Sequence, residues 1–203
     1  MEKEIRAFNV EMRAEEEQNG VITGRPIVYG QRTDLGWYDE IIDAGALDET
    51  DLKDVRLLVN HNTDMLPLAR SRNNTDNSTM QLRTDEDGLT MKAVLDVENN
   101  ADAKSLYSAV SRGDITGMSF MFTVAKDAWD DAGSEHPTRH VRSIDRVFEL
   151  SAVTWPAYSA TSIQARGLAD ALESAKASLE SERNRLAEIE KRKQKIRILT
   201  EVL

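Results

Sequence analysis

Apolar and polar residues alternate along short runs over the first 165 residues or so, and this period of two predicts β-strands. The clearest run, 89–97, follows the turn signal Asp87-Gly88. The polar stretches 71–78 and 127–138 are predicted to be exposed loops. Six short strands with few helices favour a mainly β fold with some α (α+β), arranged as a small closed β-barrel. The other strand-like runs are 5–12, 21–29, 55–61, 118–124 and 147–154.

One helix is predicted among these strands. Asn100 is a suitable N-cap, and Gly113 is a suitable residue to end the helix. Between them, Leu106 and Val110 are four residues apart and therefore share one helical face.

Helical periodicity takes over from Gly167. Two series of positions recur every seven residues, as in a coiled coil, although Glu182, Lys193 and Thr200 interrupt the apolar seam. An isolated helix of this length is marginally stable, so we expect it to pair with another helix. The alternative is an amphipathic helix folded back on the body. The chain thus divides into a body, 1–165, and a helical tail, 166–203. The series are Leu168, Ala175, Glu182, Ile189, Ile196 and Leu203, and Leu172, Leu179, Leu186, Lys193 and Thr200.

Composition and charge exclude several classes of function. The chain has no cysteine, which rules out disulfides and cysteine catalysis and suits an intracellular protein. Its net charge is −10, and residues 167–203 carry eight basic and seven acidic groups, so the body carries −11. An acidic body argues against general nucleic-acid binding. No apolar run approaches the roughly 18 residues of a membrane span, and no secretory signal is expected.

His61 closes the apolar run 55–61 and shares the parity of Leu57 and Val59. On a strand these side chains would point to one face, which we expect to be the inner one. A histidine in such a place is commonly a core or rim residue. The other interpretation is a general base, because histidine titrates near neutral pH.

Ser119 lies in the run 113–122, Gly-Asp-Ile-Thr-Gly-Met-Ser-Phe-Met-Phe. It is expected to face away from its apolar neighbours Met118 and Phe120. Most serines in strands are structural, and a nucleophilic serine needs a base that is itself oriented by a third group. The run is not a nucleophile elbow, since position 121 is methionine rather than glycine.

Glu149 is a candidate for the third group, because a carboxylate can hold a histidine in the required tautomer. It shares strand parity with Ser151 and Val153. The alternative for Glu149 is a surface position at a strand edge. His140 is the rival third member, since a second histidine can also orient the first.

Metal and cofactor sites are not expected. His61, His136 and His140 show no paired ligand spacing, and the acidic residues form no calcium-binding loop. No glycine-rich phosphate loop is present either. The basic cluster 191–197 fits a solvated helix face better than a nucleic-acid contact.

Together these segments resemble the prohead serine proteases of tailed bacteriophages, a family similar in fold and mechanism to the herpesvirus assemblins. The joint order and spacing of the segments are more specific than any one of them. The matching segments are 24–29 (Gly-Arg-Pro-Ile-Val-Tyr), 37–47 (Trp-Tyr-Asp-Glu-Ile-Ile-Asp-Ala-Gly-Ala-Leu), 59–62 (Val-Asn-His-Asn), 87–89 (Asp-Gly-Leu), 113–122, and 149–161 (Glu-Leu-Ser-Ala-Val-Thr-Trp-Pro-Ala-Tyr-Ser-Ala-Thr).

The resemblance implies a β-barrel serine endopeptidase that needs no cofactor. It would work in the host cytoplasm, inside the assembling procapsid, and cleave the scaffolding segment from the major capsid protein and then itself. Ser119 would be the nucleophile, His61 the general base and Glu149 the third member. The stretch 158–166 is a candidate self-cleavage region.

The tail could bind the helical scaffold region of the capsid protein or a second copy of the chain. The competing interpretation is a non-catalytic capsid-assembly protein that keeps the fold, although retention of both His61 and Ser119 speaks against it.

Overall fold

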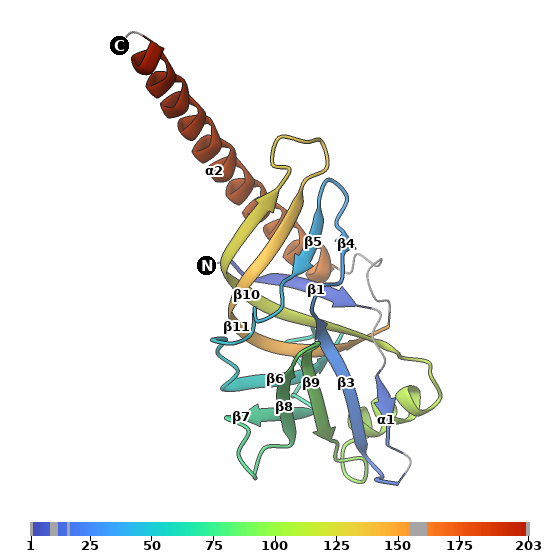
Figure 1. Ribbon diagram of the computed structural model, residues 1–203. Helices are drawn as coiled ribbons and strands as arrows, with labels where there is room; N and C mark the ends of the chain where they lie inside the picture. Colours follow the sequence, from blue (N-terminus) through green and yellow to red (C-terminus); the bar gives the residue numbers. More distant parts are fainter. Residues whose placement is uncertain (1, 9–11, 16, 155–161, 202–203) are drawn as a thin grey trace.

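The computed structural model describes residues 2–8, 12–15, 17–154 and 162–201, which form two β-sheets and two helices (Figure 1). The seven-stranded sheet contains β1 (Glu4–Phe8), β4 (Thr33–Asp34), β5 (Asp39–Ile42), β6 (Asp54–Val59), β7 (Ala69–Arg72), β10 (Gly117–Asp130) and β11 (Thr138–Val153). The four-stranded sheet contains β2 (Arg13–Ala14), β3 (Val21–Val28), β8 (Met80–Asp85) and β9 (Gly88–Val94). The helices are α1 (Ala101–Ser111) and α2 (Ser162–Glu201).

The large sheet is organised around the long antiparallel hairpin of β10 and β11. β1 pairs with the free edge of β10. On the other side, residues 138–141 of β11 pair in parallel with β5, and residues 149–152 pair in parallel with β6. Four register shifts between β10 and β11 interrupt the ladder, and such bulges bend and twist a hairpin.

Neither sheet closes into a barrel, so the predicted closed β-barrel is wrong. Within the described residues, the small sheet runs β2-β3-β9-β8, and no ladder joins it to the large sheet. Alternation along a chain tells which segments are strands and which faces are apolar, but it does not tell which edges pair. The prediction of a β-rich fold with a long C-terminal helix is confirmed.

Each of the six predicted strand runs contains a strand, but the boundaries differ. The predicted loop 127–138 shrinks to 131–137, because polar residues continue the β10–β11 ladder at both ends. The run 5–12 forms β1 only as far as Phe8, and residues 9–11 lie outside the described part of the chain. The short strands β2, β4, β5, β7 and β8 were not predicted.

The predicted helix cap at Asn100 and the predicted turn at Asp87-Gly88 agree with the structure. The side chain of Asn100 accepts hydrogen bonds from the backbone N–H groups of Asp102 and Ala103, which caps α1 as predicted. Gly88 follows the β8–β9 turn with φ of 138°, where a Cβ would lie 2.0 Å from the carbonyl oxygen of Ile27. Only glycine fits this approach of β9 to β3.

The main hydrophobic core lies between the two sheets and α1, and sheet alternation supplies it from both sides. It includes Ile22 and Met91 from the small sheet, Phe120 and Leu150 from the large sheet, and Leu106 from α1. The core therefore fixes one face of β10 and β11 and leaves their other face for polar residues.

The first half of α2 packs against the body. Ala175 and Leu179 are buried against Tyr38, Trp129 and Ala132. The indole N–H of Trp129 donates to Ser178, whose hydroxyl in turn donates to Asp127. In this part of the tail, the helix is folded back on the body, which was the alternative to pairing with another helix.

The second half of α2 projects away from the sheets (Figure 1). Leu186, Ile196 and Ile198 are 43%, 65% and 61% exposed, so these three apolar side chains are largely uncovered and pairing with another helix stays a prediction. The division at 165/166 also stays a prediction, and that position lies inside α2. Neither α1 nor the described part of α2 is both long and apolar enough to cross a membrane.

Candidate active site

Ser119 lies on β10 between two neighbouring strands, opposite Ala7 of β1 and Ser151 of β11. Its neighbours Met118 and Phe120 point into the main core, so Ser119 faces away from the core as predicted. The side chain is fully buried, and its hydroxyl donates a 2.7 Å hydrogen bond to the backbone carbonyl of Arg6 on β1.

His61 does not continue the strand, contrary to the parity prediction. β6 ends at Val59, and Asn60 and His61 have positive φ values of 50° and 57°. Strand parity would place His61 on the core face with Leu57. The left-handed turn instead brings its ring to Glu149, on the opposite face of the sheet. Left-handed backbone at non-glycine residues costs on the order of 1 kcal/mol or more, so the surrounding contacts must hold it.

Glu149 and Ser151 supply those contacts. In the parallel register, Glu149 lies beside Arg56 and Ser151 beside Leu58, so both share a face of the large sheet. His61 Nδ1 is 2.5 Å from Glu149 Oε1, and Nδ1 carries the hydrogen because a carboxylate only accepts. Ser151 Oγ donates to Glu149 Oε2 at 2.6 Å and accepts from the backbone N–H of His61 at 3.1 Å.

The sequence predicts this network of side chains only in part. The sequence indicated Glu149 as one of two candidates but gave Ser151 no role. The signal available was the shared parity of Glu149 and Ser151, which predicts that their side chains are neighbours on one face. The contribution of Arg6 through its carbonyl had no signal in the sequence, because any residue type presents that group.

Ser119 and His61 lie on the same face of the sheet, but no hydrogen bond joins them among the described residues. Ser119 is paired across strands with Ser151, the residue that contacts His61. His61 Nε2 is buried and has no hydrogen-bond partner within the described part of the chain. The free nitrogen of the base and the hydroxyl of the candidate nucleophile are thus both enclosed and not engaged with each other.

His140, the rival third member, lies elsewhere on β11. Its Nδ1 is 2.7 Å from Asp43 and its Nε2 is 3.3 Å from Asp130. Both ring nitrogens therefore contact carboxylates, and neither contacts His61. His136 lies in the hairpin loop 131–137, with its side chain 44% exposed.

A buried cluster of charges anchors β1 beside Ser119. Arg6 binds Glu4 at 2.6 Å and Glu40 at 2.5 Å, while Arg139 binds Glu4 at 2.8 Å and Glu40 at 3.1 Å. Two cations and two carboxylates therefore neutralise one another away from water. Burial raises the pKa of Glu40, but the attraction and hydrogen bonds of Arg6 and Arg139 together outweigh it and hold that pKa below its usual value. Burial raises the pKa of Tyr38 to about 12.

One group of side chains in the described residues could offer ligands to a metal: Asp34, Asp39 and His136, whose ligand atoms all lie within 4.8 Å of one another. Asp39 already pairs with Arg32 at 2.7 Å and with His136 at 3.1 Å. Hydrogen bonding from Arg32 lowers the pKa of Asp39. The ion pairs account for the arrangement.

A serine on β10, a buried carboxylate on the adjoining β11 and a histidine in the turn after β6 are the types of group that acyl-transfer hydrolases of the serine-protease class use. In a comparison with protein families, residues 8–175 match the Caudovirus prohead serine protease family. The match covers most of the chain, and the protein belongs to that family of serine proteases, with a role in phage head maturation. Searches of curated proteins and of solved structures gave no match.

Proposed function

We propose that Ser119 is the nucleophile, His61 the general base and Glu149 the group that orients the base. The observation that carries this proposal is the buried contact between His61 Nδ1 and Glu149, one strand away from Ser119. Glu149 holds the proton on Nδ1, which leaves Nε2 as the atom that can accept a proton. Ser151 acts as a positioning residue, because it fixes both the carboxylate and the backbone of the histidine turn.

Catalysis requires Ser119 to exchange its hydrogen-bond partner. Its hydroxyl proton now points to the Arg6 carbonyl, which cannot take up a proton at neutral pH. When the side chain donates to His61 Nε2 instead, the imidazole can remove the proton as the oxygen attacks the scissile carbonyl. The described contacts thus correspond to a resting arrangement of the site.

The reaction then follows acyl transfer. The Ser119 oxygen bonds to the scissile carbonyl carbon, and the imidazolium of His61 returns its proton to the leaving amine as the peptide bond breaks. Water, deprotonated by the same histidine, releases the acid product and regenerates the serine. Glu149 stays ionised and stabilises the positive imidazolium during both steps.

Family membership supports action on proteins of the procapsid. We propose the major capsid protein, at its scaffolding segment, as the substrate inside the assembling head, followed by the protease itself. The candidate self-cleavage region, 158–166, includes residues outside the described part of the chain, and its end lies in α2. The exposed second half of α2 would bind a helical partner, either the scaffold region or a second copy.

The test is co-expression with the major capsid protein of the same phage. Wild type should shorten the capsid protein, whereas Ser119→Ala should leave it at full length, because no other oxygen can form the acyl-enzyme. Ser71→Ala is the matched control, since Ser71 is also a fully buried strand serine but belongs to β7. Capsid protein of equal size with wild type and with Ser119→Ala would contradict the proposal.

A further inference from the structure

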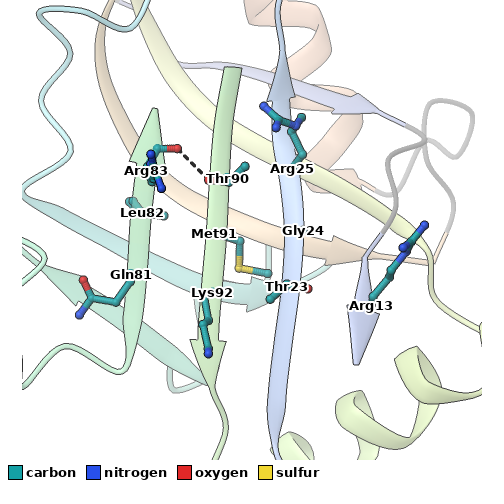
Figure 2. Close-up of a pocket in the computed structure, with 10 residues that line it drawn as sticks. All are labelled: Arg13, Thr23, Gly24, Arg25, Gln81, Leu82, Arg83, Thr90, Met91 and Lys92. Atoms are coloured by element: carbon teal, nitrogen blue, oxygen red, sulfur yellow. Dashed lines mark hydrogen bonds between the residues drawn. The ribbon is translucent and has the colours of Figure 1, made fainter. Parts of the chain in front are cut away.

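A second surface with its own chemistry lies on the small sheet. Four cationic side chains, Arg13, Arg25, Arg83 and Lys92, come from four different strands and border one shallow concavity of about 620 Å³ (Figure 2). We call these four residues the basic face. None of the side chains that border the concavity is acidic, and none belongs to the candidate active site.

Sheet alternation produces the basic face. Leu82 and Met91 point into the main core, so their neighbours Arg83 and Lys92 point outward. The register places Arg13 opposite Thr23, and Thr23 opposite Lys92 on the next strand. Cations on β2 and β9 therefore flank a hydroxyl group in one row across the sheet.

A second row has the same composition. Arg83 on β8 lies opposite Thr90 on β9. Gly24 of β3 pairs with Met91, and Arg25 follows it at a bulge, so Arg25 lies on the far side of Thr90. Strands are about 4.8 Å apart and alternate outward residues are about 7 Å apart along a strand. Hydroxyl groups thus repeat between the cations at the spacing of an extended polypeptide.

The cations differ in how much of their charge is already compensated. Arg25 binds Asp85 at 2.5 and 2.9 Å, and this contact lowers the pKa of Asp85 to about 2. Lys92 Nζ instead contacts the neutral side chain of Gln18 at 3.1 Å. Among the described residues, no carboxylate forms an ion pair with Lys92 or Arg83, so these two cations provide most of the uncompensated charge.

We propose that the basic face binds an acidic, extended polypeptide segment of a partner or substrate protein. The carboxylates of the segment would pair with Arg83 and Lys92. The side-chain oxygens of Thr23, Thr90 and Gln81 would accept hydrogen bonds from its backbone N–H groups, because their donor groups already bind the Glu15 carboxylate and the backbone carbonyls of Arg83 and Thr75. A peptide with a few carboxylates suits this surface better than a nucleic acid, because the net charge of −10 repels a dense polyphosphate. The inference does not depend on the chemistry of Ser119.

The experiment uses the full chain carrying Ser119→Ala, so that no probe is cleaved. Fluorescence anisotropy measures binding of a labelled peptide of six Glu-Ser repeats at low and at physiological salt. We expect binding that weakens with salt, and at least a tenfold loss of affinity in Arg83→Gln/Lys92→Gln. Lys104→Gln/Lys126→Gln is the matched control, because it removes two exposed cations from other surfaces.

Three results would overturn the proposal: equal loss of affinity in the control variant, equal binding of a Gln-Ser repeat peptide, or tighter binding of a single-stranded oligonucleotide of the same length. A melting temperature unchanged between the two double variants shows that the fold is intact. Failure of capsid cleavage with the wild-type chain would count against the proposed function alone, since this binding assay contains no active serine.

Discussion

The turn at Asn60 and His61 decides where the candidate base lies. Two consecutive left-handed residues carry the imidazole from the core face of β6 to the face that bears Glu149. The turn is held by the Asn60 N–H bond to the carbonyl of Ala152 and by the Ser151 hydroxyl. The sequence could indicate His61 as a candidate but not this backbone, because asparagine and histidine also occupy ordinary strand geometry.

At the scale of residues, substitutions of Glu149 and of His140 distinguish the two candidates for the group that orients His61. Glu149→Gln should slow capsid-protein cleavage by at least about a hundredfold, because an amide no longer stabilises the imidazolium and allows the other tautomer. His140→Gln should have little effect, since His140 contacts Asp43 and Asp130 instead. Time courses of cleavage measure both, and a larger loss in His140→Gln would reverse the assignment.

Ser151 should affect the rate through the carboxylate of Glu149. Ser151→Ala leaves Glu149 Oε2 without its hydroxyl donor, and a buried unsatisfied acceptor costs about 1–3 kcal/mol. We expect a roughly tenfold to hundredfold loss of rate, at 1.4 kcal/mol per factor of ten, and a shifted pH–rate profile. Ser151→Thr keeps the hydroxyl and should recover much of the rate. An unchanged pH profile in Ser151→Ala would reduce Ser151 to a purely structural residue.

At the scale of elements, β1 joins the candidate site to the buried charges. Its backbone accepts from Ser119, and its side chains Glu4 and Arg6 complete the cluster with Glu40 and Arg139. Hydrophobic alternation predicted this strand, but charged residues at Glu4 and Arg6 gave no sign of burial. Their burial depends on partners from β5 and β11 that are distant in sequence, so only the fold could reveal it.

Acid sensitivity follows from the cluster. The pKa of Glu40 in the folded chain is lowered, so its ionised form stabilises the fold above its usual pKa of about 4.3. That stabilisation is lost as the pH falls through the lowered value, and the melting temperature should therefore drop steeply below about pH 4. Glu40→Gln should cost roughly 3–5 kcal/mol at pH 7, because Arg6 and Arg139 lose a charge partner.

Thermal unfolding between pH 3 and 7 measures these effects, with Glu86→Gln as the control because Glu86 is exposed. The Glu40→Gln chain should show the smaller change on acidification. A parallel decline in both variants and wild type would place the acid sensitivity elsewhere in the chain.

On the scale of the whole molecule, α2 is one helix with two environments. Ala175 and Leu179 complete an aromatic cluster on the body, whereas Leu186, Ile196 and Ile198 are exposed. The heptad spacing predicted a helix with an apolar seam. The spacing could not predict where the apolar seam stops packing against the body and becomes exposed. The reason is that the aromatic residues that pack against the first half come from the distant β5 and β10 regions.

This division gives a direct test of the role of the tail. A chain ending after Arg185 keeps Ser178, Leu179 and Arg183, which contact the body, and removes the exposed half. We expect an unchanged melting temperature but loss of incorporation into procapsids, measured by the amount of protease in purified procapsids. Normal incorporation of the shortened chain would exclude the exposed half of α2 as the targeting segment.

The pairing of β1 with β10, and of His61 with Glu149, has a consequence for biosynthesis. On the ribosome, His61 and Ser119 are made before Glu149 and Ser151, so under the proposed assignment a nascent chain has a nucleophile but lacks the groups that orient its base. Under the same assignment, a prematurely released chain that stops short of β11 should be inert.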